Sequence, residues 1–400
     1  MSFAGRVVLK PRRARPFFAR HPWVFDSSID HVVGNPAPGD QVDVETREGQ
    51  FIARGLYNPT STIRVRLYRW DDGSLDEAFW TESIARALRL RHVVLGLGKD
   101  ESAYRLVFSE GDGLSGLTVD RYDRWLVVQF TSLALSTRRE LILRLLAAST
   151  GADGIIARTE RGIARKEGLR AGEEMTIGSV PDEPVEIVEN GLTYRVDLRA
   201  GQKTGYYLDQ RINRRVVAGY CRDKRVLDLF CFSGGFALNA VKHGGATAVL
   251  GVDSSAPSIE LCRHHAAING VDRARFEAGD VLEVLDRLRR DGATFDVVIC
   301  DPPKYARQAK DVENALKGYL RLNQAALDVL EPDGVLVACS CSGLVGRARF
   351  AEMIGSLAEH SGRPIQILEQ RGQAPDHPIS ASCLETEYLK CLICRVGSRQ

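Results

Sequence analysis

The sequence predicts an α/β protein whose C-terminal half is a doubly wound parallel sheet. From about residue 186, continuous apolar runs alternate regularly with helical segments, which is typical of parallel strands covered by helices. The first 70 residues differ, because short strand signals are separated by turn residues, as in a small β-barrel. The stretch between them mixes both signals and predicts a small α+β domain. Since 400 residues suit two or three domains, we expect boundaries at 1–72, 73–185 and 186–400.

The barrel segment is predicted to contain four strands, at 7–9, 41–46, 51–57 and 63–68. It is also the basic part of the chain: residues 1–70 hold eleven Lys and Arg against six Asp and Glu, while the whole chain has a net charge of only +2. Arg64, Arg66 and Arg69 crowd largely one side of the last strand. Two interpretations stay open, a solvated charged face or an electrostatic footprint for a phosphate backbone.

The central segment is predicted to combine two helices, at 75–95 and 137–149, with strands at 104–108, 117–120, 125–130 and 154–158. It contains a glycine-rich loop, Glu110-Gly-Asp-Gly-Leu-Ser-Gly116. Such loops usually provide turn geometry, so we interpret this one as a turn rather than a ligand loop.

The C-terminal segment is predicted to alternate strands and helices. The strands fall at 225–230, 248–253, 274–278, 295–301 and 334–339, and the helices at 235–243, 256–268, 281–290, 312–330 and 347–360.

Cysteine usage and apolar patterning restrict the class of protein. The nine cysteines all lie at Cys221 or later and are odd in number, which does not fit a secreted disulfide framework. No apolar run reaches the length of a membrane helix, and the first residues lack the apolar stretch of a signal peptide. We therefore expect a cytoplasmic protein with reduced thiols and no membrane partner. Cys391 and Cys394 suggest zinc or redox chemistry, but positions i and i+3 of a strand face opposite sides, so we expect a packed strand and no metal.

Acidic residues end the predicted strands of the parallel sheet at intervals of one strand–helix unit. They are Asp228, Asp253, Asp280 and Asp301. Ligands of open α/β sheets bind beyond the carboxyl ends of the strands, so these side chains are expected to face one crevice. Asp253 suits the two hydroxyl groups of a ribose.

A glycine-containing loop, Cys231-Phe-Ser-Gly-Gly235, follows the first of these strands and leads into a helix. A nicotinamide dinucleotide is one candidate ligand, since Asp253 follows Gly234 at a suitable spacing, but the required G-x-G-x-x-G is absent. S-adenosylmethionine fits better, because it lacks a pyrophosphate and needs one more polar group for its adenine. Asp280 supplies that group or, alternatively, only caps the following helix. The expected cofactor-binding residues around this loop also include Asp228, Phe230, Ser233 and Gly235.

Several motifs resemble one family. They are Gly201-Gln-Lys-Thr-Gly-Tyr-Tyr-Leu-Asp-Gln-Arg211, Val226-Leu-Asp-Leu-Phe-Cys-Phe-Ser-Gly-Gly235, Asp301-Pro-Pro-Lys304, Ser340-Cys-Ser342 and His21-Pro-Trp-Val-Phe25. Together they are similar to the class I methyltransferases of the ribosomal RNA large subunit methyltransferase I group, over the whole chain. The resemblance implies a PUA-like RNA-binding barrel, a central α+β domain and a Rossmann-like domain that uses S-adenosylmethionine to form 5-methylcytosine in 23S rRNA. It makes a homodimer plausible, and it implies that Lys203 or Arg211 meets the cofactor carboxylate, although each also suits a surface cation.

Cys341 is the candidate nucleophile. C5 of cytosine is a poor nucleophile, and a thiolate that adds to C6 makes C5 able to attack the methyl sulfonium. Cys341 matches the family's Ser-Cys-Ser cysteine and should lie beyond the end of its strand, whereas its rival Cys339 lies two residues earlier.

Asp301 is expected to anchor the flipped base and to act in catalysis, on a loop that Pro302 and Pro303 hold extended beneath the ring. The base that removes the C5 proton is not identified; Asp301 and His377 are candidates, and His377 is also expected near the substrate.

Three other functions stay open at the level of sequence. Asp-Pro-Pro would suffice to methylate a purine nitrogen, with no need for a covalent cysteine. The same covalent chemistry would form 5-methyluridine, because no residue singled out here distinguishes the C4 substituent. A non-catalytic RNA-binding or ribosome-assembly factor is a different class of function, which the intact glycine loop, ribose acid and cysteine argue against.

Overall fold

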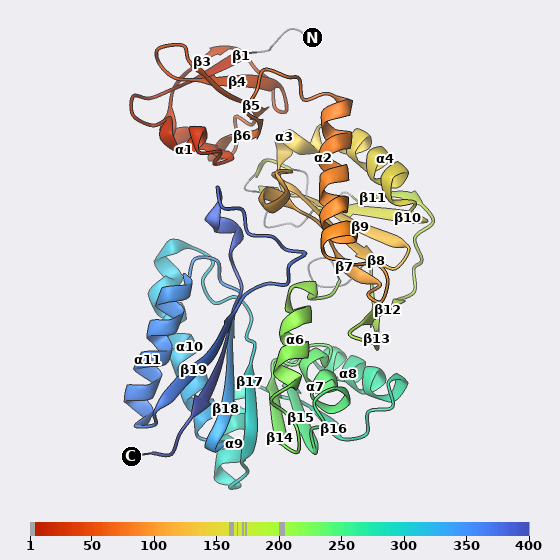
Figure 1. The fold of residues 1–400 in the computed structure, drawn as a ribbon, viewed down its shortest axis with the longest axis vertical. Coiled ribbons are helices and arrows are strands. Elements are labelled where there is room, and N and C mark those ends of the chain that lie inside the picture. The colour runs from red at the N-terminus through yellow and green to blue at the C-terminus, as the bar shows by residue number, and fades with distance from the viewer. Residues whose placement is uncertain are drawn as a thin grey trace. The chain divides into compact units, whose positions relative to one another are not determined.

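The computed structural model describes residues 5–159, 164–165, 167–169, 172, 174–199 and 205–399. The chain forms two compact units (Figure 1). The first comprises Met1–Ile187, Val196–Leu208 and Pro375–Thr386, and the second comprises Val188–Arg195, Asp209–Ala374 and Glu387–Gln400. Among the described residues, no helix is both long enough and apolar enough to span a membrane.

The first unit begins with a six-stranded sheet in the order β2-β6-β5-β4-β1-β3. Its elements are β1 Gly5–Leu9, α1 Arg15–Phe18, β2 Trp23–Phe25, β3 Ile29–Gly34, β4 Gln41–Glu45, β5 Phe51–Tyr57 and β6 Ile63–Arg69. The strands alternate between buried and exposed positions, so that Val7, Val42, Val44 and Val65 fill one core. The sequence predicted four of these strands but not β2 and β3, which are short or largely exposed.

The first unit continues with a five-stranded sheet in the order β11-β10-β9-β8-β7. Its elements are α2 Glu77–Arg89, β7 Ala103–Phe108, β8 Leu117–Tyr122, β9 Trp125–Phe130, α3 Leu133–Ser136, α4 Arg139–Thr150, β10 Gly154–Arg158 and β11 Glu174–Gly178. Asp76 caps α2 by accepting a hydrogen bond from the Phe79 amide at 3.0 Å. The predicted helix at 75–95 therefore starts two residues later than expected, and it ends in a wider turn over Leu90–Val94.

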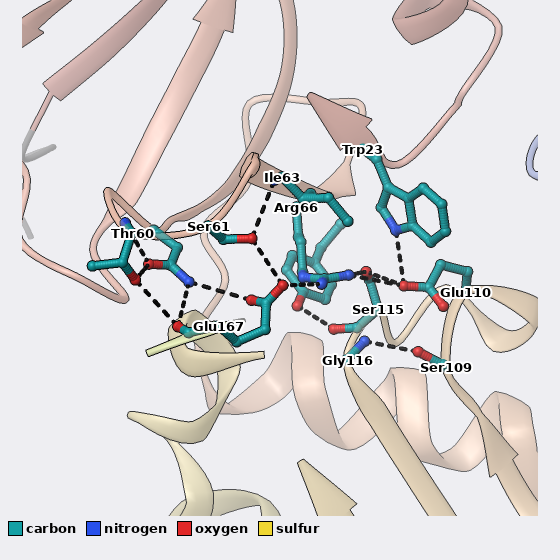
Figure 2. Close-up of polar contacts among 12 residues, drawn as sticks. Trp23, Thr60, Ser61, Ile63, Arg66, Ser109, Glu110, Ser115, Gly116 and Glu167 are labelled. Atoms are coloured by element: carbon teal, nitrogen blue, oxygen red, sulfur yellow. Dashed lines mark hydrogen bonds and ion pairs between the residues drawn. The ribbon is translucent and has the colours of Figure 1, made fainter. Parts of the chain in front are cut away.

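A buried polar network explains why the barrel and the central domain form a single unit (Figure 2). Arg66 on β6 donates to Glu110 Oε1 and to Glu167 Oε1, each at 3.1 Å. Trp23 Nε1 and Ser115 Oγ also donate to Glu110 Oε1, at 2.9 and 2.6 Å. Arg66, which the sequence placed on a basic surface, is therefore paired with two internal carboxylates. The glycine-rich loop that carries Glu110 and Ser115 has a structural role.

A late segment, Pro375–Thr386, also belongs to the first unit, although the sequence analysis assigned it to the C-terminal domain. Asp376 fixes it there, because its Oδ2 accepts from the Arg105 amide at 2.9 Å and its carbonyl accepts from Arg91 Nη2 at 2.6 Å. Such partners, 271 and 285 residues away along the chain, are not visible in a sequence pattern.

The second unit contains a seven-stranded sheet in the order β16-β15-β14-β17-β18-β20-β19. Its strands are β14 Arg225–Leu229, β15 Ala248–Asp253, β16 Ala274–Ala278, β17 Phe295–Cys300, β18 Leu330–Ser340, β19 Ile365–Arg371 and β20 Lys390–Val396. The first five are parallel, and β20 pairs antiparallel with β18 and β19. The predicted Cys391 and Cys394 thus lie in a packed strand, and both are buried.

Helices cover both faces of this sheet (Figure 1). They are α6 Arg211–Ala218, α7 Gly235–Lys242, α8 Ala256–Ile268, α9 Val281–Arg290, α10 Val312–Leu327 and α11 Arg347–Ser361. Leu227 and Leu229 of β14 pack toward the core formed with α9, α10 and α11, while Asp228, on the opposite face, bonds to α7. A separate hairpin is formed by β12 Val185–Glu189 and β13 Leu192–Val196. Because β14 pairs with both β15 and β17, it marks the point where the strand order reverses, which is where ligands of such sheets bind.

Candidate functional site

The loop after β14 is tightly wound. Phe230, Phe232 and Gly234 have φ values of 61°, 49° and 83°, a left-handed conformation that non-glycine residues rarely adopt. Gly234 is the N-cap residue of α7, so the free amides of the helix start at this loop. Gly235 has a packing reason of its own, because an added Cβ would lie 2.5 Å from Arg214 Nε. The glycines therefore shape the loop, and only Gly234 is required by its backbone conformation.

Asp228 supports the loop from the interior of the sheet. Its Oδ2 accepts from the Ala237 amide in the first turn of α7 at 3.0 Å. Burial raises the pKa of Asp228 to about 8. Its Oδ1 has no hydrogen-bond partner within the described part of the chain. The predicted cofactor contact of Asp228 stays a prediction, because its carboxyl group is almost wholly buried.

Asp253, at the end of β15, is partly exposed at the same edge. Its Oδ2 accepts from the Phe232 amide at 3.0 Å, and its Oδ1 accepts from the Ser255 amide at 2.9 Å. Each carboxylate oxygen has further lone pairs, so both remain able to accept from ribose hydroxyls. Ser233 in the adjoining loop is buried, and its hydroxyl has no partner among the described residues.

Asp280 caps α9, as the alternative interpretation of the sequence stated. Its Oδ1 accepts from the Leu282 and Glu283 amides at 2.9 and 3.2 Å. The side chain is exposed, and the predicted adenine contact stays a prediction.

Asp301 follows β17 and is held by a partner that sequence reasoning missed. Gln210 Nε2 donates to Asp301 Oδ2 at 3.0 Å, and Asn213 Nδ2 donates to Gln210 Oε1 at 2.7 Å. Both amides are buried, so they fix the direction of the carboxyl group. Gln210 lies in the motif that ends at Arg211, but the sequence does not show that it meets Asp301. Pro302 is buried and Pro303 is exposed.

Cys341 and Cys339 differ in accessibility. Cys300 on β17 lies opposite Ala338 on β18, so Asp301 and Cys341 both follow the carboxyl ends of neighbouring parallel strands. Cys339 is 1% exposed and faces Cys391 on β20, whose hydrogen bond raises the pKa of Cys339 well above its usual value. Cys341 is partly exposed. The geometry therefore favours Cys341 as the reactive thiol.

Two serines on either side of Cys341 fix its turn. Ser340 Oγ and Ser342 Oγ are each 3.0 Å from the buried Tyr319 hydroxyl on α10. Ser342 Oγ also accepts from the Ala306 amide at 3.3 Å. The Ser-Cys-Ser motif thus anchors the loop after Asp301 to the end of β18.

Three further residues were predicted for the site. Lys203 is outside the described residues. Arg211 begins α6, is buried, and accepts from Asn190 Nδ2 through its carbonyl at 3.1 Å. His377 belongs to the first unit, where it is 2% exposed, bonds to Asp376 Oδ1 at 3.1 Å and packs on Phe108.

Within the described part of the chain, one group of three potential metal ligands comes together, in the first unit. His21, Cys383 and Glu385 have ligand atoms within 4.8 Å of one another. His21 Nδ1 accepts from the Trp23 amide at 3.3 Å, which places the ring hydrogen on Nε2, 3.5 Å from Glu385 Oε1. This contact between His21 and Glu385 needs no metal ion to explain it.

The second unit thus has the features of a nucleoside-binding crevice: a tight glycine loop, a ribose-type carboxylate and two strand ends carrying Asp301 and Cys341. Residues 112–385 match the family described as S-adenosylmethionine-dependent methyltransferase, and residues 7–70 match a PUA-like domain. The protein is therefore an S-adenosylmethionine-dependent methyltransferase with a PUA-like N-terminal domain, which confirms the predicted fold class and cofactor. The acceptor set at the loop fits this cofactor, since Asp253 retains lone pairs for a ribose.

Similar curated proteins show to which family of methyltransferases the chain belongs. The chain is 40% identical over 398 residues to the Ribosomal RNA large subunit methyltransferase I of Aeromonas hydrophila, covering 98% of this chain and 99% of that one. It is 38% identical over 393 residues to the protein of the same name from Tolumonas auensis, covering 97% and 98%. The chain belongs to the ribosomal RNA large subunit methyltransferase I family, as the motifs predicted.

A solved structure shares the whole fold. A putative SAM-dependent methyltransferase from Streptococcus mutans superposes with a TM-score of 0.83 at 20% identity, covering 98% of this chain and 100% of that one.

Proposed function

We propose that this protein methylates C5 of a cytosine in 23S rRNA through a covalent adduct between Cys341 and C6 of the base. The observation that carries the proposal is the partly exposed Cys341 beyond the end of β18, beside β17, the strand that Asp301 follows. The named relatives act on ribosomal RNA of the large subunit, which supports rRNA as the substrate.

The covalent route follows from the reactivity of the base. The Cys341 thiolate forms a bond to C6, and the electron pair of the C5–C6 double bond moves so that C5 becomes nucleophilic. Bound S-adenosylmethionine supplies an electrophilic methyl group for C5. A base then removes the C5 proton, the double bond re-forms, and the C6–sulfur bond breaks to release the Cys341 thiolate.

Asp301 acts on the target base in this proposal. Its carboxyl group, held by Gln210 at 3.0 Å, lies close to N3 and gives this nitrogen its proton as the thiolate adds, which neutralises the negative charge that the addition places on the ring. Pro302 and Pro303 keep the loop extended beneath the ring. Asp301 and His377 are the candidates for the base that removes the C5 proton.

The cofactor is held by the residues around the β14 loop. Asp253 accepts from the ribose hydroxyls, Asp280 meets the adenine, and the backbone of Gly234 and Gly235 lets the cofactor approach. Lys203 or Arg211 meets its carboxylate. None of these contacts needs a metal ion.

Phosphate contacts are proposed for one exposed segment of the barrel. Since Arg66 is paired internally, the basic surface must come from elsewhere on this domain. Residues 10–20 carry exposed cations, namely Lys10, Arg12, Arg13, Arg15 and Arg20. Cations that neutralise phosphates make binding weaken steeply as salt rises, so RNA affinity should fall steeply with ionic strength.

The test is methyl transfer to rRNA from cells lacking the gene, with the product mapped by mass spectrometry. Cys341→Ala should reduce transfer by about a thousandfold or more, because the nucleophile is lost. Cys339→Ala is the matched control and should retain activity, since that thiol is sealed in the sheet.

Each different result of the methyl-transfer test would favour one of the alternative functions. Full activity of Cys341→Ala would remove the covalent mechanism and favour methylation of a purine nitrogen. A 5-methyluridine product would keep the mechanism but change the base. Absence of any transfer by the unaltered protein would favour a non-catalytic RNA-binding factor.

A further inference from the structure

Lys390 is a buried cation that the proposed reaction does not yet use. It is the first residue of β20 and is 1% exposed. Its Nζ donates to the Ser342 carbonyl at 2.6 Å and to the Tyr388 carbonyl at 2.8 Å. The first of these carbonyls belongs to the residue directly after Cys341, so the ammonium is anchored on the turn that carries the thiol.

This ammonium has no ion-pair partner in the part of the chain that the structure describes. Of the acidic groups in the described residues, none makes an ion pair with Lys390. Burying an ammonium with only neutral acceptors is unfavourable, and buried charges in proteins are normally paired. Burial accordingly lowers the pKa of Lys390 to about 8, and the strongest charge that acts against this is a thiolate at Cys341.

We propose that Lys390 is a positioning residue that keeps Cys341 in its thiolate form at neutral pH. The thiolate then supplies a counter-charge for the buried ammonium inside the second unit. The thiol proton leaves to solvent, and the ammonium keeps its own proton. This proposal rests on the proposed function in one respect, since it explains how Cys341, the proposed nucleophile, is kept as a thiolate.

Other charged groups around Lys390 do not replace this partner. Glu387 is already paired, with Arg347 Nε donating to its Oε1 at 2.9 Å. Arg347 and Lys304 are cations and disfavour the Lys390 charge. Tyr319 is neutral, because burial raises its pKa above the usual value. Among the described residues, Cys341 is thus the group whose negative charge favours the ammonium most, followed by Glu387.

The test measures the pH dependence of Cys341 alkylation by iodoacetamide in the full chain, with the Cys341 peptide quantified by mass spectrometry. An ordinary thiol has a midpoint near about 8.5, and an adjacent cation lowers it by roughly one to three units. We expect the unaltered protein to show a midpoint at least about one unit below that of an ordinary thiol. Lys390→Met should raise the midpoint by about one unit or more and slow alkylation at pH 7 about tenfold.

Two further variants serve as controls. Lys390→Arg keeps the positive charge and should keep the low midpoint of Cys341 alkylation. If the lysine side chain served only in packing, the midpoint would not depend on its charge. Lys317→Met removes a surface lysine of α10 and should leave the profile unchanged.

The outcomes are decisive even if one variant does not fold. An unchanged midpoint in folded Lys390→Met overturns the proposal, and so does a midpoint at or above that of an ordinary thiol in the unaltered protein. No RNA is used, so loss of rRNA methylation with a low midpoint would overturn the proposed function alone.

Discussion

Buried charge is compensated to different degrees at Arg66, in the first unit of the molecule, and at Asp228 and Lys390, in the second. In the first, Arg66 is surrounded by Glu110 and Glu167, and every charge of the group has a partner (Figure 2). In the second, Asp228 is buried with one oxygen unpartnered among the described residues, and Lys390 is buried against carbonyls alone. Removing one partner from a buried ion pair strongly destabilises a fold, whereas buried groups with shifted pKa values are candidates for a role in chemistry.

The two glycine-containing loops show the same contrast. The loop at 110–116 places Glu110 and Ser115 against Arg66, which lies 44 residues from Glu110 along the chain. The loop at 231–235 instead begins a helix at the reversal point of a parallel sheet, beside Asp253. The composition of the two loops does not show which one is structural and which one lies at the binding site. The residues that each loop contacts do show it.

The largest expected effect breaks the paired group. Arg66→Met leaves Glu110 and Glu167 buried without a cation, and we expect a loss of about 3–5 kcal/mol in the free energy of unfolding. Urea unfolding of the full chain, followed by tryptophan fluorescence, measures it. The control is Arg6→Met, which removes an exposed pair with Glu45 and should cost less than about 1 kcal/mol. Equal losses in the two variants would contradict the comparison.

Asp228 in the second unit should make the stability of the protein depend on pH. Burial raises the pKa of Asp228 in the folded protein to about 8 from the ordinary aspartate value of 3.8, so between these pH values the folded state holds a proton that the unfolded state has lost. Stability from this group is fully present below pH 3.8 and is lost as pH rises through 8.

Asp228→Asn removes that titration. We expect the free energy of unfolding of the variant to increase relative to that of the unaltered protein as pH rises from 5 to 8, by up to about 1.4 kcal/mol per pH unit. Hydrogen exchange of the β14 amides at several pH values measures the difference. A difference that does not change with pH would show that Asp228 is ionised in the folded protein.

The smallest expected effect concerns an exposed acid of the second unit. Asp280→Ala removes the cap of α9 and should lower stability by about 1 kcal/mol. Calorimetric titration with S-adenosylmethionine separates its two roles: weaker binding by about tenfold supports the adenine contact, given the worth of one hydrogen bond to a ligand. Unchanged affinity would leave Asp280 as a helix cap only.

Much of the second unit is predictable from sequence. The strands at 248–253 and 274–278 and the helices at 256–268 and 281–290 have the predicted bounds, because apolar runs and capping residues are local signals. The strand β19 was missed, since most of its residues are polar or exposed at the edge of the sheet. The acids at the strand ends were found because the carboxyl ends of parallel strands share one edge.

The sequence by itself determined the family, the cofactor and the order of elements, since motifs and periodicity are properties of neighbouring residues. Only the tertiary structure decided that Cys339 is sealed and Cys341 is accessible, that Gln210 holds Asp301, and that Arg66 is neutralised internally. The reason is physical. Burial and charge pairing depend on contacts such as Arg66 with Glu167, which lie 101 residues apart, and on how each strand registers with its neighbour.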